Sequence, residues 1–281
     1  MAVINTNMAS LSAQTSLMKT QSALQLSMQR LSSGLRVNSA KDDAAGLAIA
    51  DSMTSQIRGM TVASRNANDG ISMAQTAEGA MGQITDLFQR MRDLAVQAAN
   101  RAAVGSADRE KLQTEFRQLG LEVKRIVNNT TVNGKNVLKT GLSNANFQVG
   151  WSTTANNQIS VTVSNFSTLS GVQSLFGNGR SIGSAATSVS VRSVIENIDI
   201  AIGKVDKFRA TLGAAQNRFS ATISNLASSI ENQSAARSRI MDADFAQETA
   251  SLARAQVLQQ AGTAMFAQAN QLPQNVLSLL K

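Results

Sequence analysis

The chain has 281 residues, with 26 Lys or Arg and 18 Asp or Glu, which give a formal net charge of +8 at pH 7. It contains no Cys and no His, which excludes disulfides, thiolate nucleophiles, histidine acid–base catalysis and the usual zinc sites. Catalysis by carboxylates or Lys stays open, but the composition favours a protein that is not an enzyme and that holds no metal and no cofactor.

The positive charge does not indicate nucleic-acid binding, because Lys and Arg are interspersed with acids and do not cluster with aromatic residues. No run of about 18 apolar residues is present that could cross a bilayer. Residues 1–7 lack the basic segment and apolar core of a cleaved secretory signal. We therefore predict no nucleic-acid partner, no membrane partner, and export, if any, by a route without such a signal.

The first segment is amphipathic but nearly uncharged, since Lys19 is the only charged residue among the first 29. Its apolar residues follow a helical spacing: Leu17, Leu24, Met28, Leu31 and Leu35. The small residues at 32–34 predict a break, and Ser39, Asp42 or Asp43 could cap the next helix.

The second segment predicts the longest helix, because apolar residues recur at intervals of three and four from Met53 to Ala98. A break at 103–108 leads to a third helix, with a seam from Leu112 to Ile126. Asn133-Gly134 between short β-prone runs then predicts a tight hairpin.

The middle segment predicts a small β region, because Arg180 is the only charged residue from 140 to 191 and apolar residues alternate there. The alternating residues are Phe147, Val149 and Trp151, followed by Ile159, Val161 and Val163. Helix returns near Ser193, breaks at 242–244, and continues in a last helix to Pro273. The residues from Ala255 to Leu280 carry no charge at all.

The resulting fold class is mainly α: a long antiparallel, coiled-coil-like helical rod with a small β-hairpin region at the end far from the termini. A soluble helix normally has a charged outer face. Both ends of this chain lack one, so we expect them to pair with each other and to become buried in an assembly.

The sequence resembles the bacterial flagellins. The resemblance rests on residues 30–47 (RLSSGLRVNSAKDDAAGL) and 65–72 (RNANDGIS) near the first end, and on residues 238–244 (SRIMDAD) and 267–271 (AQANQ) near the other. Long motifs at both ends, in the right order, make this signal specific for the family.

The family pattern implies a D0 domain formed by residues 1–44 with 238–281, and a D1 helical bundle formed by 45–139 with 190–237. Residues 140–189 would be a short β-rich insert that belongs to D1. The resemblance also implies a secreted structural subunit, exported unfolded by the flagellar type III apparatus and polymerised into the hollow extracellular filament for motility.

The partners implied by the resemblance are further copies of the chain, the export chaperone FliS, and the flagellar cap and hook-associated proteins. Innate immune recognition of the monomer by Toll-like receptor 5 and NAIP sensors is implied as well. Residues of the Toll-like receptor 5 patch carry over to Gln89, Arg90, Leu94, Gln97 and Glu115, whereas helical periodicity alone would favour a solvated face or a subunit contact there.

The terminal helices supply the expected polymerisation core. Its apolar residues are Leu17, Leu24, Met28, Leu31, Leu258, Met265, Leu272, Val276, Leu277, Leu279 and Leu280. The tail at 276–280 also resembles the end read by NAIP sensors.

The alternative within the same broad family is a hook–filament junction protein. A membrane-active type III translocator would need a longer apolar stretch, and an enzyme within the insert would need more charged residues than the segment has. The pairs Asp42/Asp43 and Asp242/Asp244 fit helix capping better than a metal site or acid–base catalysis.

Overall fold

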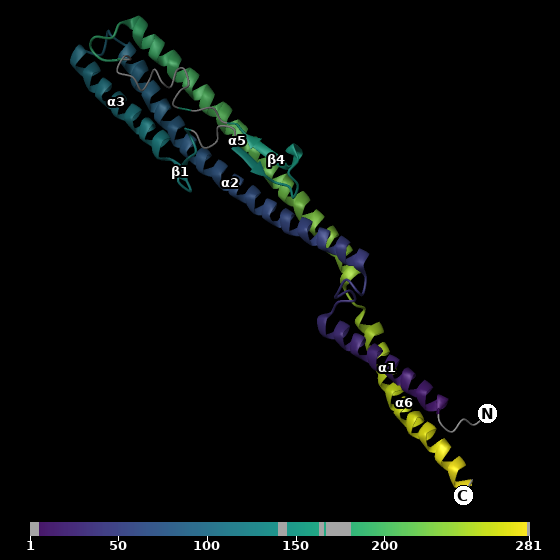
Figure 1. Ribbon diagram of the computed structural model, residues 1–281. Coiled ribbons are helices and arrows are strands. Elements are labelled where there is room, and N and C mark those ends of the chain that lie inside the picture. The colour runs from purple at the N-terminus through teal and green to yellow at the C-terminus, as the bar shows by residue number, and fades with distance from the viewer. Residues whose placement is uncertain (1–5, 140–144, 163–165, 167–180, 280–281) are drawn as a thin grey trace. The chain divides into compact units, whose positions relative to one another are not determined.

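The computed structural model describes residues 6–139, 145–162, 166 and 181–279, with the backbone alone for 272–279 (Figure 1). Helices dominate the described residues, as predicted: α1 (Met8–Ser33), α2 (Ala44–Ala99), α3 (Ser106–Asn129), α5 (Ser188–Met241) and α6 (Phe245–Leu279). Four short strands complete them: β1 (Thr131–Val132), β2 (Lys135–Asn136), β3 (Ala145–Gln148) and β4 (Gln158–Val161), with a 3₁₀ turn, η1, at Ala155–Asn157.

The chain folds into two compact units. One comprises Met1–Gln56 with Glu231–Lys281 and contains α1 and α6; we call it the terminal unit. The other comprises Ile57–Ile230, with α3, both hairpins and most of α2 and α5; we call it the central unit. The long helices α2 and α5 each contribute residues to both units.

Most helix ends lie where turn-forming and capping residues predict them. Helix α1 ends at Ser33 because Gly34 adopts a left-handed conformation, with φ of 70°, and its N–H bonds the Arg30 carbonyl at 2.8 Å. The Asp43 carboxylate accepts the Gly46 N–H at 2.8 Å and caps α2. The Asp244 carboxylate accepts the N–H groups of Ala246 and Gln247 and caps α6.

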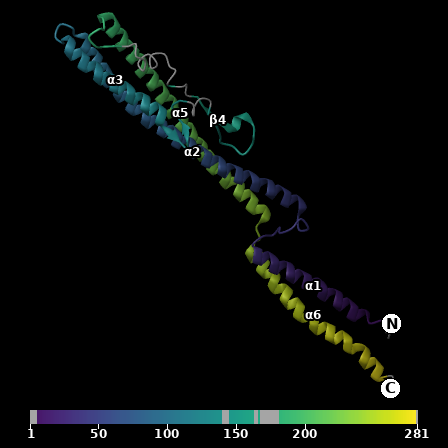
Figure 2. The ribbon, with the colours of Figure 1, turned by 60° about the vertical axis from the view of Figure 1, so that its left-hand side comes forward.

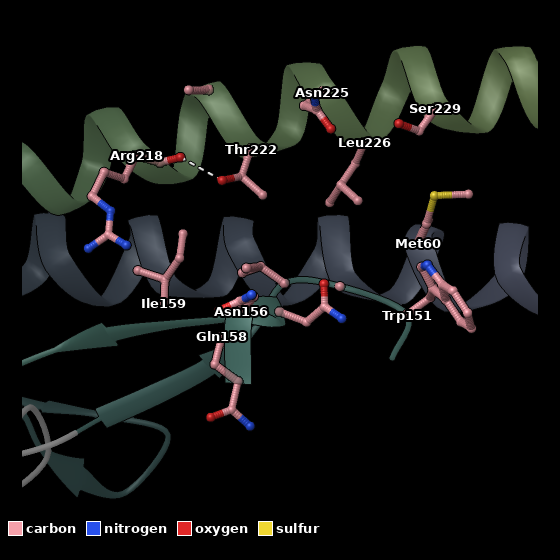
Figure 3. Close-up of a pocket in the computed structure, with 14 residues that line it drawn as sticks. Met60, Trp151, Asn156, Gln158, Ile159, Arg218, Thr222, Asn225, Leu226 and Ser229 are labelled. Carbon is pink, nitrogen blue, oxygen red and sulfur yellow. Dashed lines mark hydrogen bonds between the residues drawn. The ribbon is translucent and has the colours of Figure 1, made fainter. Parts of the chain in front are cut away.

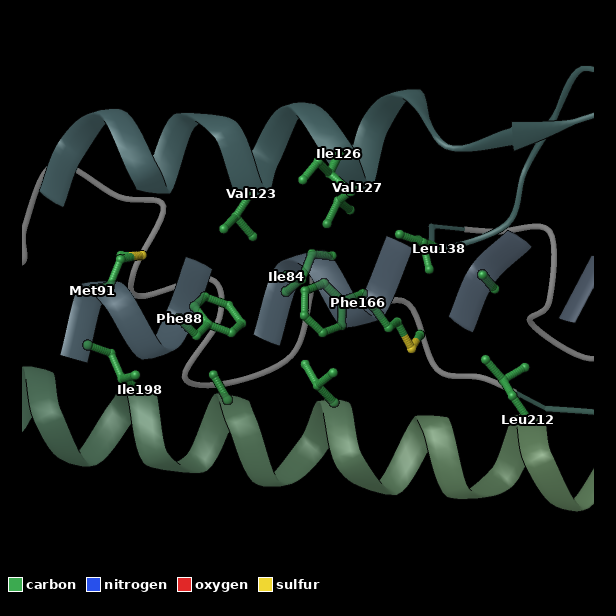
Figure 4. Packing of buried hydrophobic residues seen from close by; sticks show 14 of the residues in the cluster. Ile84, Phe88, Met91, Val123, Ile126, Val127, Leu138, Phe166, Ile198 and Leu212 are labelled. Atoms are coloured by element: carbon green, nitrogen blue, oxygen red, sulfur yellow. The ribbon is translucent and has the colours of Figure 1, made fainter. Parts of the chain in front are cut away.

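The central unit has one continuous hydrophobic core between α2, α3 and α5 (Figure 4). The predicted seam of α2 is buried throughout its second half, at Ala77, Met81, Ile84, Phe88, Met91, Ala95 and Ala98. From α3 and α5, Val123 and Ile198 enter the same core, and Phe166 packs against Phe88 with ring centroids 6.4 Å apart.

Helices α2 and α5 run antiparallel, as polar contacts at successive levels show. Gln216 Nε2 donates to Glu78 Oε2 at 2.8 Å, and Arg92 Nε donates to Asp199 Oδ1 at 2.7 Å. Farther along the same two helices, Gly70 of α2 faces the Phe219 ring of α5. The predicted antiparallel pairing of the helices on either side of the insert is therefore confirmed within this unit.

The first hairpin has the predicted two-residue turn. Strands β1 and β2 pair antiparallel, with Val132 opposite Lys135, and Asn133 and Gly134 both have positive φ, at 49° and 74°. This combination is the one that a type I′ turn requires. Just beyond it, the Asn136 amide donates to the carbonyls of Val127 and Asn128 and so satisfies the end of α3.

The second hairpin pairs β3 with β4, with Phe147 opposite Ile159. Val149, Ile159 and Val161 are buried, in agreement with the predicted alternation. The expectation that Trp151 continues the pattern is wrong: β3 ends at Gln148, whose side-chain amide bonds the Gly150 and Ser152 carbonyls, and Trp151 is exposed. Val163 lies outside the described residues.

The last helix continues past Pro273 to Leu279, whereas the sequence predicted that it would end there. Proline has no N–H, so it leaves the carbonyl four residues earlier, at Ala269, without its helical partner. The Asn7 side-chain amide supplies the missing donor, with Nδ2 2.8 Å from the Ala269 oxygen. The Asn7 amide oxygen meanwhile accepts the Ser10 N–H and caps α1.

Two glycines of α2 make a matched pair for testing the core. A Cβ added at Gly70 would lie 2.8 Å from Cζ of the buried Phe219 ring, which packs edge-on against Phe147; nothing lies within 4 Å of a Cβ at Gly79. We predict that Gly70→Ala lowers the free energy of unfolding by about 1–2 kcal/mol, because overpacking exceeds the gain in helix propensity.

Gly79→Ala is the control and should raise the unfolding free energy by up to about 1 kcal/mol through helix propensity alone. Urea denaturation followed by circular dichroism measures both variants. A Gly70→Ala midpoint equal to or above that of Gly79→Ala would contradict the close packing of α2 on α5.

Candidate functional site

The terminal unit is built on an antiparallel pair of helices, α1 and α6, which lie side by side in both views (Figures 1 and 2). Their contacts keep one register along the pair. At one end the Ser10 hydroxyl donates to Asn270 Oδ1 at 2.7 Å, and at the other Arg30 lies 3.8 Å from Glu248. The predicted pairing of the two ends of the chain is thus confirmed.

Backbone bonds tie the two connectors of this unit together. The Arg36 N–H donates to the Met241 carbonyl at 2.7 Å, and the Ala243 N–H donates to the Gly34 carbonyl at 3.0 Å. The turn after α1 and the break between α5 and α6 therefore form one small paired structure, closed by the bridge between Leu35 and Asp242.

Asp42 organises the connector before α2. Its carboxylate accepts hydrogen bonds from the Ser39 hydroxyl and from the N–H groups of Asn38 and Ser39. These bonds, led by that of the hydroxyl, hold the pKa of Asp42 below its ordinary value of 3.8. Because the folded-state pKa is lowered, the stabilisation is present at neutral pH and is lost only as the pH falls through that pKa. Asp42 and Asp43 are therefore occupied with local hydrogen bonds.

The unusual property of the terminal unit is how much of its apolar surface faces solvent. In α1 the described core contains only Ser27, and among the α6 side chains that the structure describes only Ala255 and Ala269 are buried. Large apolar side chains stand exposed on both helices: Met8, Leu11, Met18, Leu26, Met28, Phe245, Val257, Leu258 and Met265. Lys19, Arg30, Glu248 and Arg254 are the only charged residues among those from 8 to 33 and 245 to 279.

The residues expected in the polymerisation core, where their side chains are described, fall into two groups by exposure. Leu17, Leu24 and Leu31 are half-buried, and Leu17 approaches α6 so closely that a Cβ on Gly262 would lie 3.0 Å from its Cδ1. Met28, Leu258 and Met265 are 48%, 52% and 64% exposed. The side chains of Leu272, Val276, Leu277 and Leu279, and the whole of Leu280, lie outside the described residues.

A second candidate surface lies on the central unit where α2 faces α3. Nε and Nη2 of Arg90 donate to the same Glu115 oxygen, Oε1, at 2.9 and 2.7 Å. Gln89 and Gln97 are exposed on α2, whereas Leu94 is 2% exposed and belongs to the core. Four of the five residues assigned to receptor recognition are thus exposed, whereas the Leu94 side chain packs into the core of the central unit.

The adjacent face of α2 carries a comparable ion pair to α5. Arg92 and Asp199 are 45% and 49% exposed, and their hydrogen bond raises the pKa of the Arg92 guanidinium. On α3, the bond to Arg125 lowers the pKa of Glu122. Exposed pairs of this kind contribute little to stability and serve mainly to define the charge pattern of the surface.

The central unit also has an open groove of about 550 Å³ between α5 and the loop that joins β3 to β4 (Figure 3). Met60, Leu226 and Ile159 form its apolar floor, and Trp151 and Arg218 lie at opposite ends. It contains no carboxylate and no general base, and the described residues hold no group of three or more His, Cys, Asp or Glu that could bind a metal. Apart from Arg218, the groove is lined by apolar and uncharged polar residues.

Sequence reasoning missed the groove and one buried cation. Arg109, in the first turn of α3, is 6% exposed, and its Nε and Nη1 have no hydrogen-bond partner. It lies seven residues before Phe116 and so on the core seam of α3, a spacing that could have revealed its burial. The groove has no comparable signal, because it depends on how the β3–β4 loop crosses α2 at Gly59.

Comparison with known proteins assigns the chain to a family. Residues 4–141 match the bacterial flagellin N-terminal helical region, and residues 195–280 match the bacterial flagellin C-terminal helical region. The chain belongs to the bacterial flagellin family. The resemblance seen in the terminal motifs is thereby confirmed, and the two matched regions flank the short β-rich segment.

Relatives match this flagellin family member along nearly its whole length. It is 41% identical to flagellin from Bacillus subtilis, with 99% of each chain covered, and 40% identical to flagellin from Halalkalibacterium halodurans, with 99% of this chain and 100% of the relative covered. It is also 40% identical to the flagellar filament 33 kDa core protein of Treponema phagedenis, at 99% and 100% coverage.

A crystal structure of Bacillus cereus flagellin aligns with 58% of this chain and 88% of that chain, at 27% identity and a TM-score of 0.47. Among the described residues, no helix is long and apolar enough to span a membrane.

The sparse burial in α1 and α6 leads to a prediction about the free subunit. Amide hydrogens of α1 and α6 should exchange with solvent much faster than those of α2 between Ala74 and Ala98. Few buried side chains oppose local opening in α1 and α6, whereas this part of α2 lies in the core. Hydrogen exchange measured by mass spectrometry on dilute monomer tests this. Equal protection of α1, α6 and that part of α2 would show that the helix pair is stable without partners.

Proposed function

We propose that this flagellin is a structural subunit that polymerises through the exposed apolar surface of α1 and α6 into the hollow helical filament of the bacterial flagellum. The observation that carries the proposal is the row of exposed large apolar residues on two helices almost without charge. Such a surface is unfavourable in water and marks a site of protein association. The flagellin names of the relatives support the same function.

A filament requires a contact between different patches on successive subunits that repeats without closing into a ring. In our proposal, residues 1–44 and 238–281 form the D0 domain at the filament core, and residues 45–139 and 190–237 form the D1 bundle around it. Residues 140–189 complete the β part of D1. The subunit acts by assembly, through the apolar surface of α1 and α6.

The route to the filament follows from the same terminal helices. Segments that bury little surface alone stay easy to unfold and become ordered when partners cover them. We propose that the chain leaves the cell unfolded through the flagellar type III apparatus, that FliS covers its C-terminal helix before export, and that the cap and hook-associated proteins guide assembly outside the cell.

Assembly can be tested at a single position of α6. Leu258→Glu should slow the elongation of filament seeds by about tenfold or more, because a buried, unpaired carboxylate is costly at an interface. The matched control Leu258→Met keeps the size and apolar character of the side chain and should elongate like the parent chain. Electron microscopy and sedimentation measure the polymer formed.

The parent chain must form long hollow filaments on the seeds. Short caps or persistent monomers would instead favour a hook–filament junction protein. Normal elongation by Leu258→Glu would remove this face of α6 from the subunit contact.

We further propose that host receptors recognise the monomer. Exposure of Gln89, Arg90, Gln97 and Glu115 on adjoining helices supports a Toll-like receptor 5 contact at this surface. The apolar tail at 276–280 is the proposed target of NAIP sensors. In the filament both regions would face neighbouring subunits, so recognition would require release of monomer.

The receptor surface can be tested with two matched double variants. Arg90→Ala with Glu115→Ala should shift the dose curve of receptor reporter cells to higher concentration by about tenfold, because two polar anchors are lost. Arg92→Ala with Asp199→Ala removes an ion pair with the same 2.7 Å separation from the adjacent face and should leave the curve unchanged. Equal curves for the two variants would contradict the assignment.

A further inference from the structure

The described methionines of this chain range from fully buried to largely exposed, with Met53, Met73 and Met241 half-buried. Of the 11 methionines, those with large exposed side chains among the described residues are Met8, Met18, Met28 and Met265, at 63%, 55%, 48% and 64%. All four lie on α1 or α6. In the central unit, Met60, Met81 and Met91 are 4%, 0% and 0% exposed. Among the described methionines, the side chains most exposed to solvent are therefore on the surface proposed for polymerisation.

We propose that Met8, Met18, Met28 and Met265 form an oxidation-sensitive modification site, at which a peroxide converts the free subunit into a form that cannot join a filament. The inference rests on the proposed function, since it assumes that these side chains become buried on assembly. Its reactant is a peroxide, such as hydrogen peroxide, met by the subunit before it is incorporated.

The chemistry is a two-electron oxygen transfer. The sulfur lone pair attacks one peroxide oxygen, an S–O bond forms, the O–O bond breaks, and the second oxygen leaves as water after proton transfer. The sulfur is oxidised to a sulfoxide and the peroxide is reduced. This reaction requires contact between the reagent and the sulfur, so exposed methionines react before buried ones.

The product changes the property on which assembly depends. Methionine is apolar and flexible and packs well against irregular surfaces, whereas its sulfoxide is polar and chiral. A sulfoxide buried at a subunit contact would leave an oxygen that must be desolvated. Four methionine sulfoxides on α1 and α6 would therefore weaken the subunit contact at several points.

Assembly in turn should protect the site, because neighbouring subunits would cover α1 and α6. The buried Met81 and Met91 provide an internal reference, since their surroundings in the core of the central unit do not require a partner. Oxidation would therefore distinguish the free subunit from the polymer and would inactivate only the former.

The first test treats monomer and filaments with hydrogen peroxide and measures sulfoxide at each methionine by peptide mass spectrometry. In monomer, the four exposed methionines should oxidise about tenfold faster than Met81 and Met91, and in filaments they should slow by a similar factor. Uniform oxidation of all methionines in monomer, or no protection in filaments, would overturn the proposal.

The second test measures seeded elongation by the oxidised monomer. Elongation should be lost after peroxide and restored by the two methionine sulfoxide reductases, one for each sulfoxide epimer. The variant with Met8→Leu, Met18→Leu, Met28→Leu and Met265→Leu should elongate equally with and without peroxide, since leucine keeps the volume and cannot be oxidised.

Undiminished elongation by oxidised parent chain would overturn the inference, as would equal loss in the quadruple variant. If that variant fails to elongate before treatment, rescue of the parent chain by the reductases decides the question. Failure of the untreated parent chain to elongate seeds would contradict the proposed function instead.

Discussion

The structure depends on an imbalance in hydrophobic burial between its two units. In the central unit, three helices enclose a continuous core, with side chains such as Phe88, Met91 and Leu212 wholly removed from water. In the terminal unit, two helices contact each other along one stripe and leave apolar side chains exposed around the rest of their surface. A pair of helices can bury only one face of each member, so the remaining stability must come from other molecules.

This difference assigns different tasks to the two units. The central unit has the continuous hydrophobic core and the hairpin turns on which a stable fold can rest. Its tight contacts, such as Gly70 against Phe219, fix the register of α2 and α5. The terminal unit has polar contacts that set register, such as Ser10 with Asn270, but little core. Specific contacts thus align α1 with α6, but little buried surface stabilises the pair. This combination suits a segment that completes its folding against a neighbouring molecule.

Much of this could be predicted from local patterns. Gly34, Asp43 and Asp244 mark the helix ends by backbone conformation and capping, and Asn133-Gly134 specifies its turn, because these effects involve only adjacent residues. The charge-free ends predicted an unsatisfied surface. The exposure of Trp151 and the groove at Arg218 depended on how the loop and helices meet in space, which no short window of sequence contains. Family motifs supplied the receptor assignment, and the geometry sorted its residues into surface and core.

The bond between Asn7 and Ala269 has a consequence for the order in which the terminal unit folds. An isolated α6 would lack a donor for the Ala269 carbonyl, because Pro273 cannot provide one, so its last turns would tend to separate from the rest of the helix. Docking of α1 supplies that donor from Asn7, whose amide oxygen caps α1 through a bond to the Ser10 N–H of the same helix. One side chain thus both caps α1 and supplies the donor that α6 lacks. The contact therefore favours ordering of the two helix ends together, although more than 260 residues of chain separate the bonded groups.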